Sequence, residues 1–325
     1  MEKSSEGRQI IETDIPSLIF LGTPDFAVPS LIKLIDSGVS IRLVVTQPDR
    51  PSGRGMKVGS PPVKIAAERL GIPVYQPLRV RGSEIIEYIR SFGAECAVVV
   101  AYGQILPQAF LDSFPLGVVN VHASLLPRHR GAAPIHRAIL SGDRVTGVSI
   151  MLLDAGMDTG PVFSQREVPI SEEDAFGVVH DKLAETGAGL LIETLAARGK
   201  GLLTPRPQEN DAASYAPPLK KEELRVAWDQ SAQRIVNTIR AFDPWPGAFG
   251  FLQGKRVKFY GASILNLSVQ GEPGRIVGRN EKGLAVLAGD GQVFSIGELQ
   301  MEGQRRMSAD EFLRGRPMPP GSCLQ

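Results

Sequence analysis

Short apolar runs that alternate with helical patterns are the feature of this sequence that most restricts its fold. Residues 17–22, 41–46 and 96–101 are apolar runs of strand length, and each is followed by a stretch with helical spacing, such as residues 28–37. Strands that are apolar along their whole length are buried on both faces, which is typical of parallel strands joined by helices. The pattern therefore predicts an α/β domain whose mainly parallel sheet is covered by helices on both faces.

The last third of the chain has a different pattern. Short strands are predicted between glycine-containing turns, at residues 248–252, 257–260, 274–277, 284–287 and 293–296. Such a series predicts a small antiparallel barrel. Trp245, in the run FDPWPGAF, is predicted to pack between a helix at residues 231–241 and the first of these strands, with a base-stacking platform as the alternative.

Two segments lie outside these patterns. Residues 1–16 are predicted to be a polar N-terminal extension. Residues 202–218 are rich in Pro, Ala and Asn and have no period, so they are predicted to be an interdomain linker, with an arm across the first domain as the alternative. The predicted domains are therefore residues 17–201 and 219–325.

Charge and cysteine content restrict the class of protein. The net charge is +1, but residues 216–325 carry 15 Lys and Arg against 11 Asp and Glu, a small excess that is compatible with a polyanionic partner. The only cysteines are Cys96 and Cys323, which excludes a disulfide framework and a cysteine metal site and predicts a cytoplasmic location. Neither a secretory signal nor a membrane span is expected. The turn GTPDF lacks the G-x-G-x-x-G series, so dinucleotide binding is not expected.

Three polar residues suit the transfer of an acyl group to an amine. Asn120 and His122 are two apart on a predicted strand at residues 118–122, so their side chains point to the same side, and Asp158 follows later in the chain. An Asn amide donates to an oxyanion, and a His–Asp pair supplies a second donor and accepts a proton. Each residue alone is more often structural, so only the combination predicts a catalytic site.

The run NVHASLLPRHRGAAPIHRAI, followed by MDTG, resembles the folate-dependent formyltransferases. The runs FLGTPDFAVPSL, TQPDRPSGRG, VVVAYGQILP and RAFDPWPGAF extend the resemblance over nearly the whole chain. It implies a Rossmann-like formyltransferase domain with a C-terminal OB-like barrel that binds tRNA. It also implies that 10-formyltetrahydrofolate, without a metal, gives its formyl group to the α-amine of methionine on initiator tRNA.

The chemistry of formyl transfer to an amine suggests a role for each of the three polar residues. We expect Asn120 to donate to the oxyanion and His122, kept protonated by Asp158, to be the second donor. We expect Asp158 to receive the amine's proton, directly or through water. No covalent enzyme intermediate is then needed, and we expect a monomer.

A folate pocket is also implied. The resemblance places the folate against a loop and a neighbouring strand, with the candidate residues Ser124, Leu125, Leu126, Pro127, Val99, Tyr102, Ile105, Leu106 and Asp154. The alternatives are that the two leucines of the loop belong to the core and that Asp154 is a turn residue.

The candidate tRNA contacts are basic. Residues 50–67 carry four cations and no acid, and a loop at this place resembles the segment that tRNA formyltransferases place against the acceptor stem. The candidates are Arg50, Arg54, Lys57 and Lys64, together with Arg128 and Arg130 of the later loop. The alternative for all of them is solvated surface charge, and Arg128 and Arg130 could instead contact the glutamate tail of the folate.

Two other functions compete with this prediction. One is a formyltransferase for a small amine, such as glycinamide ribonucleotide or a sugar amine, which has no need of the basic loop or the barrel. The other is a non-catalytic RNA-binding protein, which has no need of Asn120, His122 and Asp158.

Overall fold

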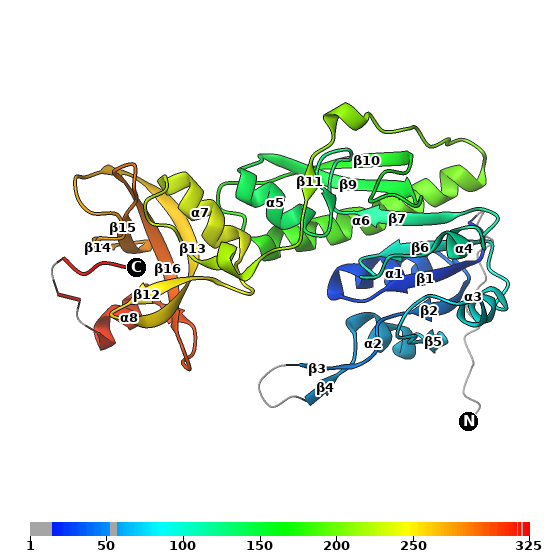
Figure 1. The fold of residues 1–325 in the computed structure, drawn as a ribbon, viewed down its shortest axis with the longest axis horizontal. Helices are drawn as coiled ribbons and strands as arrows, with labels where there is room; N and C mark the ends of the chain where they lie inside the picture. Colours follow the sequence, from blue (N-terminus) through cyan, green and yellow to red (C-terminus); the bar gives the residue numbers. More distant parts are fainter. Residues whose placement is uncertain (1–14, 53–56, 317, 320) are drawn as a thin grey trace, which may run out of the picture. The chain divides into compact units, whose positions relative to one another are not determined.

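The computed structural model of the protein describes residues 15–52, 57–316, 318–319 and 321–325, and the chain forms two compact units (Figure 1). The first unit contains the chain up to Arg130 together with Gly147–Glu167 and Lys182–Ser214. The second contains Gly131–Thr146, Val168–Asp181 and Tyr215–Gln325. The predicted domain boundaries at residues 201 and 218 stay a prediction.

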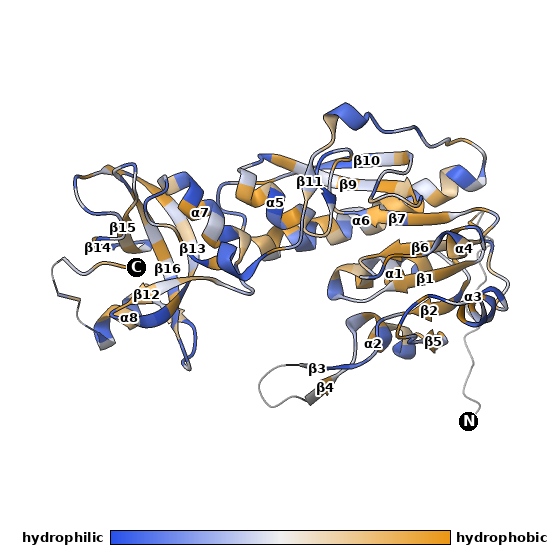
Figure 2. Cartoon of the chain, in the orientation of Figure 1, coloured by the Kyte–Doolittle hydropathy of each residue, from blue (hydrophilic) through white to orange (hydrophobic). Residues whose placement is uncertain are grey.

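A seven-stranded, mainly parallel sheet organises the first unit, which confirms the predicted α/β class. Parallel pairing joins β5, β2, β1, β6 and β7, whereas β9 is antiparallel to β7. Strands β1, β6 and β7 are buried at every position and are among the most hydrophobic segments (Figure 2). In sheet order the strands are β10 (Val162–Pro169), β9 (Val145–Leu152), β7 (Val118–His122), β6 (Cys96–Val100), β1 (Leu18–Gly22), β2 (Ile41–Val45) and β5 (Val74–Tyr75).

Helices connect the strands of this sheet. Ile89 and Phe110, from two of the helices, belong to the same buried apolar cluster as Leu21 and Val99 of the strands, so the helices pack against the sheet through their apolar sides. The helices are η1 (Asp25–Ala27), α1 (Val28–Asp36), α2 (Pro62–Arg69), α3 (Ser83–Arg90), α4 (Gln108–Leu111) and α6 (Phe176–Gly199).

The second unit contains an antiparallel sheet that the end of the chain closes. Its strands, in sheet order, are β12 (Ala248–Leu252), β13 (Lys255–Ser268), β16 (Gln292–Met301), β15 (Gly283–Leu287) and β14 (Ile276–Asn280), with β17 (Met307–Ser308) beside β16. Gln325 exchanges two backbone hydrogen bonds with Phe251 of β12, of 2.6 and 2.8 Å. On the side of β14, Leu324 N donates to Gly274 O and Ile276 N donates to Ser322 O, both at 2.8 Å. Residues 322–325 therefore lie between the two edge strands and turn the sheet into a barrel.

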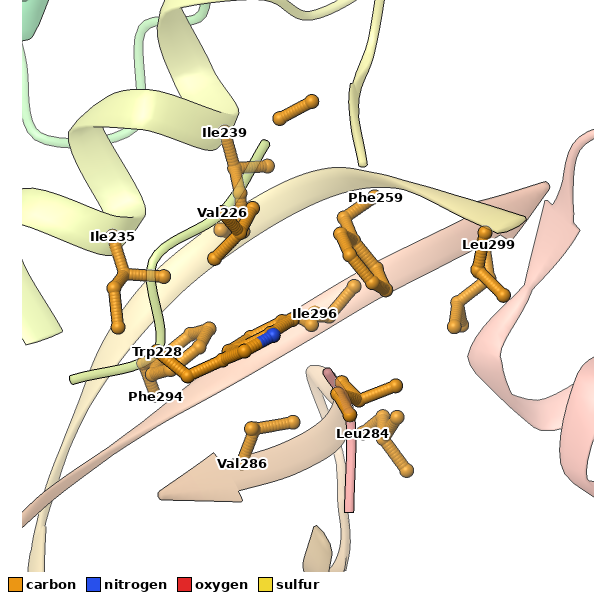
Figure 3. Packing of buried hydrophobic residues seen from close by; sticks show 14 of the residues in the cluster. Val226, Trp228, Ile235, Ile239, Phe259, Leu284, Val286, Phe294, Ile296 and Leu299 are labelled. Carbon is orange, nitrogen blue, oxygen red and sulfur yellow. The ribbon is translucent and has the colours of Figure 1, made fainter. Parts of the chain in front are cut away.

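Aromatic and aliphatic side chains fill this barrel (Figure 3). The Trp228 ring is 7 % exposed and lies 5.3 Å from the Phe259 ring and 6.3 Å from the Phe294 ring, centroid to centroid. The prediction that Trp245 packs here is wrong, because that side chain is 75 % exposed. Both tryptophans lie in turns, but only the side chain of Trp228 points into the core. The helices of this unit are α5 (Pro134–Ser141), α7 (Ala232–Ala241), α8 (Ala309–Gly315) and η3 (Lys221–Leu224).

Some elements differ from the predictions in length. β7 and β12 have the predicted bounds. β13 is 14 residues long, whereas the prediction covered only residues 257–260. The prediction stopped too early because the second half of the strand is mixed in polarity and shows no clear strand pattern. Within the predicted basic loop, β3 (Arg50–Ser52) and β4 (Lys57–Gly59) pair as an antiparallel hairpin. The remaining short elements are η2 (Asn210–Ala212), β8 (Arg130–Gly131) and β11 (Tyr215–Ala216).

Candidate active site

Strand β7 carries two of the three predicted catalytic residues. It lies between β6 and β9, where Asn120 is opposite Val99 and His122 is opposite Ser149. Because the two residues are two apart on a strand, their side chains point to the same face. Both are buried, and His122 is the last residue of the strand, at the carboxyl end of the parallel part of the sheet.

The loop between β9 and β10 brings the third residue to this place. The Asp154 carboxylate accepts hydrogen bonds from Gly156 N at 3.0 Å and from Thr159 Oγ1 at 2.8 Å, so it braces the loop as a turn residue. Asp158 lies in this turn with a left-handed φ of 53°. At Gly160 a Cβ would lie 1.9 Å from the carbonyl oxygen of Leu152, so only glycine permits this approach of the loop to β9.

Asp158 and His122 face one another. Nδ1 of His122 lies 3.7 Å from Oδ2 of Asp158, and its Nε2 lies 3.0 Å from the carbonyl oxygen of His129. A carbonyl only accepts, so Nε2 carries a proton in that hydrogen bond. Nδ1 then has a proton to offer the carboxylate only when the ring is an imidazolium. The protonated ring thus carries a donor on each nitrogen, and the carboxylate faces Nδ1 at 3.7 Å, beyond hydrogen-bond distance.

Hydrogen bonds fix the loop that follows β7. Ser124 Oγ donates to Arg128 O at 2.6 Å, and Ser149 Oγ both donates to Ser124 O and accepts from Leu126 N. Gln165 Nε2 donates to Leu126 O at 2.8 Å. Ser124 and Leu126 are buried, so their side chains shape the loop. Leu125 and Pro127 of the same loop are half-buried.

The other folate candidates are spread over different environments. Val99, Tyr102 and Leu106 are buried, whereas Ile105 is 85 % exposed. Burial raises the pKa of the Tyr102 hydroxyl to about 12. The carbonyl oxygen of Tyr102 already accepts from Thr23 Oγ1 at 2.9 Å and Gln47 Nε2 at 3.2 Å.

Arg130 was predicted to contact tRNA, but the structure buries it. Its side chain is 2 % exposed, and its guanidinium donates to Gln208 Oε1 and Asn210 Oδ1. A side chain that is buried from solvent in this way cannot contact RNA, so the prediction for Arg130 is wrong. Gln208 was missed, because the aperiodic polar stretch around it has no pattern that distinguishes one side chain from the next.

The other basic candidates have different surroundings. Arg50 and Arg128 are exposed, and Arg50 donates to Gln47 Oε1 at 3.3 Å. Lys64 pairs with Asp49 at 2.7 Å, and hydrogen bonds from Gln76 and Lys64 hold the pKa of Asp49 below its usual range. Arg54 and the Lys57 side chain lie outside the described residues.

An aromatic and basic surface lies on the outer face of β12 and β13. Phe249 and Phe251 alternate with the buried residues of β12 and therefore point outward. The Arg256 guanidinium lies 3.7 Å from the centre of the Phe249 ring, and that of Arg225 lies 5.5 Å from the centre of the Phe251 ring. Within the described part of the chain neither guanidinium forms an ion pair. By contrast, Arg305 is paired with Glu311.

Two further features concern the whole chain. Among the helices of the described residues, none is both long and apolar enough to cross a membrane. In the same residues no three His, Cys, Asp or Glu side chains lie together as a metal site would require.

Comparisons with known proteins place these features in a family. The model of the family "Formyl transferase" matches residues 17–195, and that of "Formyl transferase, C-terminal domain" matches residues 218–317. The chain is 46 % identical to the methionyl-tRNA formyltransferase of Pelotomaculum thermopropionicum, over 94 % of this chain and 98 % of that protein. It is also 46 % identical to that of Moorella thermoacetica, with the same coverage.

Solved structures with the same fold are more distant in sequence. HypX from Aquifex aeolicus in complex with tetrahydrofolic acid is 17 % identical with a TM-score of 0.64, over 95 % of this chain and 50 % of that one. The N-formyltransferase from Helicobacter canadensis in complex with folinic acid and dTDP-3-aminofucose is also 17 % identical with a TM-score of 0.64, over 90 % of this chain and 100 % of that one.

Proposed function

The chain belongs to the formyl transferase family, and we propose that it transfers the formyl group of 10-formyltetrahydrofolate to the α-amine of methionyl initiator tRNA for translation initiation. The observation that carries the proposal is the approach of His122 and Asp158 beside Asn120, in a chain that matches methionyl-tRNA formyltransferases over nearly its whole length. We further propose that it acts as a monomer in the cytoplasm.

The chemistry follows from the three side chains. The amine nitrogen attacks the formyl carbon and forms the new C–N bond, and the carbonyl oxygen becomes an oxyanion. When the C=O double bond re-forms, the bond to the folate nitrogen breaks. The Asn120 amide donates to that oxygen, and Nδ1–H of the protonated His122 ring is the second donor, while Nε2 stays bonded to the carbonyl of His129. Asp158 balances the imidazolium and receives the proton that the amine loses, directly or through water. The folate nitrogen takes up this proton from Asp158 as it leaves, directly or through water, so the enzyme returns to its starting state.

The folate is proposed to lie beside the loop after β7. Leu125 and Pro127 give it apolar cover, and Ile105 offers an exposed side chain from the loop after β6. Ser124 and Leu126 contribute by holding the loop in place, and Asp154 by holding the turn that carries Asp158. The predicted segments are kept in this assignment. Ser124, Leu126 and Asp154, which were predicted to contact the folate, instead hold the backbone of the site in place.

The tRNA is proposed to meet the hairpin of β3 and β4 and the aromatic and basic surface of residues 225, 249, 251 and 256. Arginines without an acidic partner keep their charge for phosphates, and a base stacks on a guanidinium or on an aromatic ring. The roles of Arg50, Arg54 and Lys57 stay as predicted, and Lys64 supports the base of the hairpin through Asp49. In this proposal residues 17–201 form the catalytic domain and residues 219–325 the tRNA-binding domain.

One assay tests the function. The purified protein is incubated with 10-formyltetrahydrofolate and methionyl initiator tRNA, and formyl-methionine is measured after deacylation of the tRNA. Glycinamide ribonucleotide and a nucleotide-linked amino sugar serve as competing acceptors. Formylation of the tRNA alone is expected. Formylation of a small amine but not of the tRNA would overturn the proposal.

A further inference from the structure

A single glutamine joins the loop of Asp158 to the buried arginine of the loop after β7. Gln208 Nε2 donates to Asp158 O at 2.8 Å and to Gly160 O at 2.7 Å. Its Oε1 accepts from Arg130 Nε at 3.0 Å and from Arg130 Nη2 at 2.8 Å. The amide of Gln208 therefore uses both of its ends, and its orientation is fixed because only the nitrogen end donates.

The segment that carries Gln208 is anchored at both ends to the first unit. We call residues 206–214 the arm. At its start Arg206 exchanges two backbone hydrogen bonds of 2.8 Å with Val162. At its end Ser214 O accepts from Arg130 N at 2.8 Å, and Ser214 Oγ accepts from His129 N at 2.9 Å. The arm therefore runs from the start of β10 to the loop after β7, whose His129 carbonyl accepts from His122.

The hydrogen bonds from Gln208 act on a strained stretch of backbone. A left-handed φ is uncommon for a residue other than glycine and costs on the order of 1 kcal/mol, so surrounding contacts have to maintain it at Asp158. Gln208 holds the carbonyl of Asp158 itself and that of the residue two positions later. The direction of the Asp158 carboxylate toward His122 depends on this backbone.

The buried guanidinium has a corresponding role. Arg130 is sealed from water, and its partners in the described residues are the amide oxygens of Gln208 and Asn210 and not a carboxylate. A buried charge holds its hydrogen-bond acceptors firmly, since an unpaired buried charge is costly. Arg130 thus orients the amide of Gln208, and Gln208 orients the Asp158 loop.

We propose that Gln208 and Arg130 are positioning residues for the formyl transfer: they hold Asp158 at its distance from His122, so the arm is part of the catalytic machinery. This inference rests on the proposed function. Gln208 touches no reacting atom and acts through the backbone carbonyls of Asp158 and Gly160.

The variant Gln208→Glu distinguishes a role of Gln208 in positioning Asp158 from a role in folding stability. A glutamate keeps the side-chain length and still accepts from Arg130, so the fold is expected to persist. However, it has no N–H for the two carbonyls and instead places an oxygen against them. We expect kcat to fall on the order of 10²-fold while KM for the folate and the tRNA stays within about threefold, because misplacement by an ångström costs about that much. Gln233→Glu, at an exposed position of α7, adds the same charge and is expected to leave kcat unchanged.

A double-mutant cycle shows whether Gln208 acts through Asp158. In an Asp158→Asn background, Gln208→Glu is expected to lower kcat by less than about threefold, because the group it positions is already impaired. All assays are run at a temperature at which circular dichroism shows each variant folded. Should Gln208→Glu not fold, Gln208→Asn replaces it in the cycle, since its shorter side chain cannot span Arg130 and both carbonyls.

The outcomes are distinct. A folded Gln208→Glu enzyme with kcat within about twofold of the unmodified protein would overturn the inference. So would a Gln208→Glu substitution that lowers kcat by the same factor with and without Asp158→Asn. Absence of formyl transfer in the unmodified protein would overturn the proposed function instead.

Discussion

Asp158 lies opposite His122 with 3.7 Å between Oδ2 and Nδ1, while the other ring nitrogen of His122 donates to the backbone of the same site. The carboxylate is therefore close enough to act on the charge of the ring, yet too distant for a short hydrogen bond. At this spacing Nδ1–H of the protonated ring can donate to the oxyanion, because no short hydrogen bond holds it to the carboxylate. The carboxylate can accept the proton that the amine loses. Both properties suit a site where an oxyanion and a cationic amine form together.

Removal of either oxyanion donor is expected to slow the chemical step. Asn120→Ala and His122→Ala should each lower kcat by about 10²–10³-fold, which corresponds to roughly 2.7–4 kcal/mol of transition-state stabilisation. Single-turnover formylation at saturating tRNA measures the step, and thermal unfolding confirms that the variants are folded. Either variant keeping near-normal turnover contradicts its role.

The two proposed tRNA surfaces are expected to show in the salt dependence of binding. Arg54→Ala, Lys57→Ala and Arg256→Ala should each weaken tRNA binding and reduce the slope of log Kd against log salt concentration by roughly 1, as the loss of one phosphate contact requires. Arg305→Ala is the matched control, because Arg305 is paired with Glu311. If affinity and slope do not move in the three variants, neither surface binds the tRNA.

The pH dependence of stability is expected to report on His136. Burial, with a smaller contribution from the charges of Arg137 and His180, lowers the pKa of His136 to about 4, and its ring stacks on Phe176 at 4.0 Å between centroids. An unfolded histidine titrates near ~6.5, so between these values the unfolded chain binds more protons. Stability is then present above about pH 6.5 and falls as the pH drops toward 4, by up to about 1.4 kcal/mol per pH unit. His136→Phe should reduce the fall of the urea unfolding midpoint between pH 7 and pH 5. If the midpoint falls equally in the variant and in the unmodified protein, this prediction is wrong.

The closure of the barrel is expected to contribute to stability. Leu324 is 2 % exposed, and its N–H donates to Gly274 just before β14, while Gln325 bonds β12. Leu324→Ala should destabilise the second unit by about 2–5 kcal/mol, the range for a buried leucine. The measurement is thermal unfolding, with Leu267→Ala as the control because Leu267 is 47 % exposed. Equal melting temperatures for the two variants would mean that the closure contributes little.

The sequence predicted the elements that have a strong local pattern. The apolar run of β7 determined its bounds, and the spacing of Asn120 and His122 placed both on one face. The approach of Asp158 followed from the family resemblance, because no local pattern links residues so far apart in the chain.

Features that depend on tertiary contacts could not be predicted. Arg130 and Arg128 are both arginines in a polar loop, but only the amide oxygens of Gln208 and Asn210 make the burial of Arg130 possible. Likewise, the second half of β13 is mixed in polarity, and its strand conformation comes from pairing with β16.

The arm has a consequence for dissecting the enzyme. A fragment that stops at residue 201 keeps Asn120, His122 and Asp158. It lacks Gln208, which holds the loop of Asp158, and Ser214, which accepts from the backbone of the loop after β7. Such a fragment would have the catalytic side chains without the geometry that makes them useful. A synthetic peptide of the missing stretch would then behave toward it as an activator.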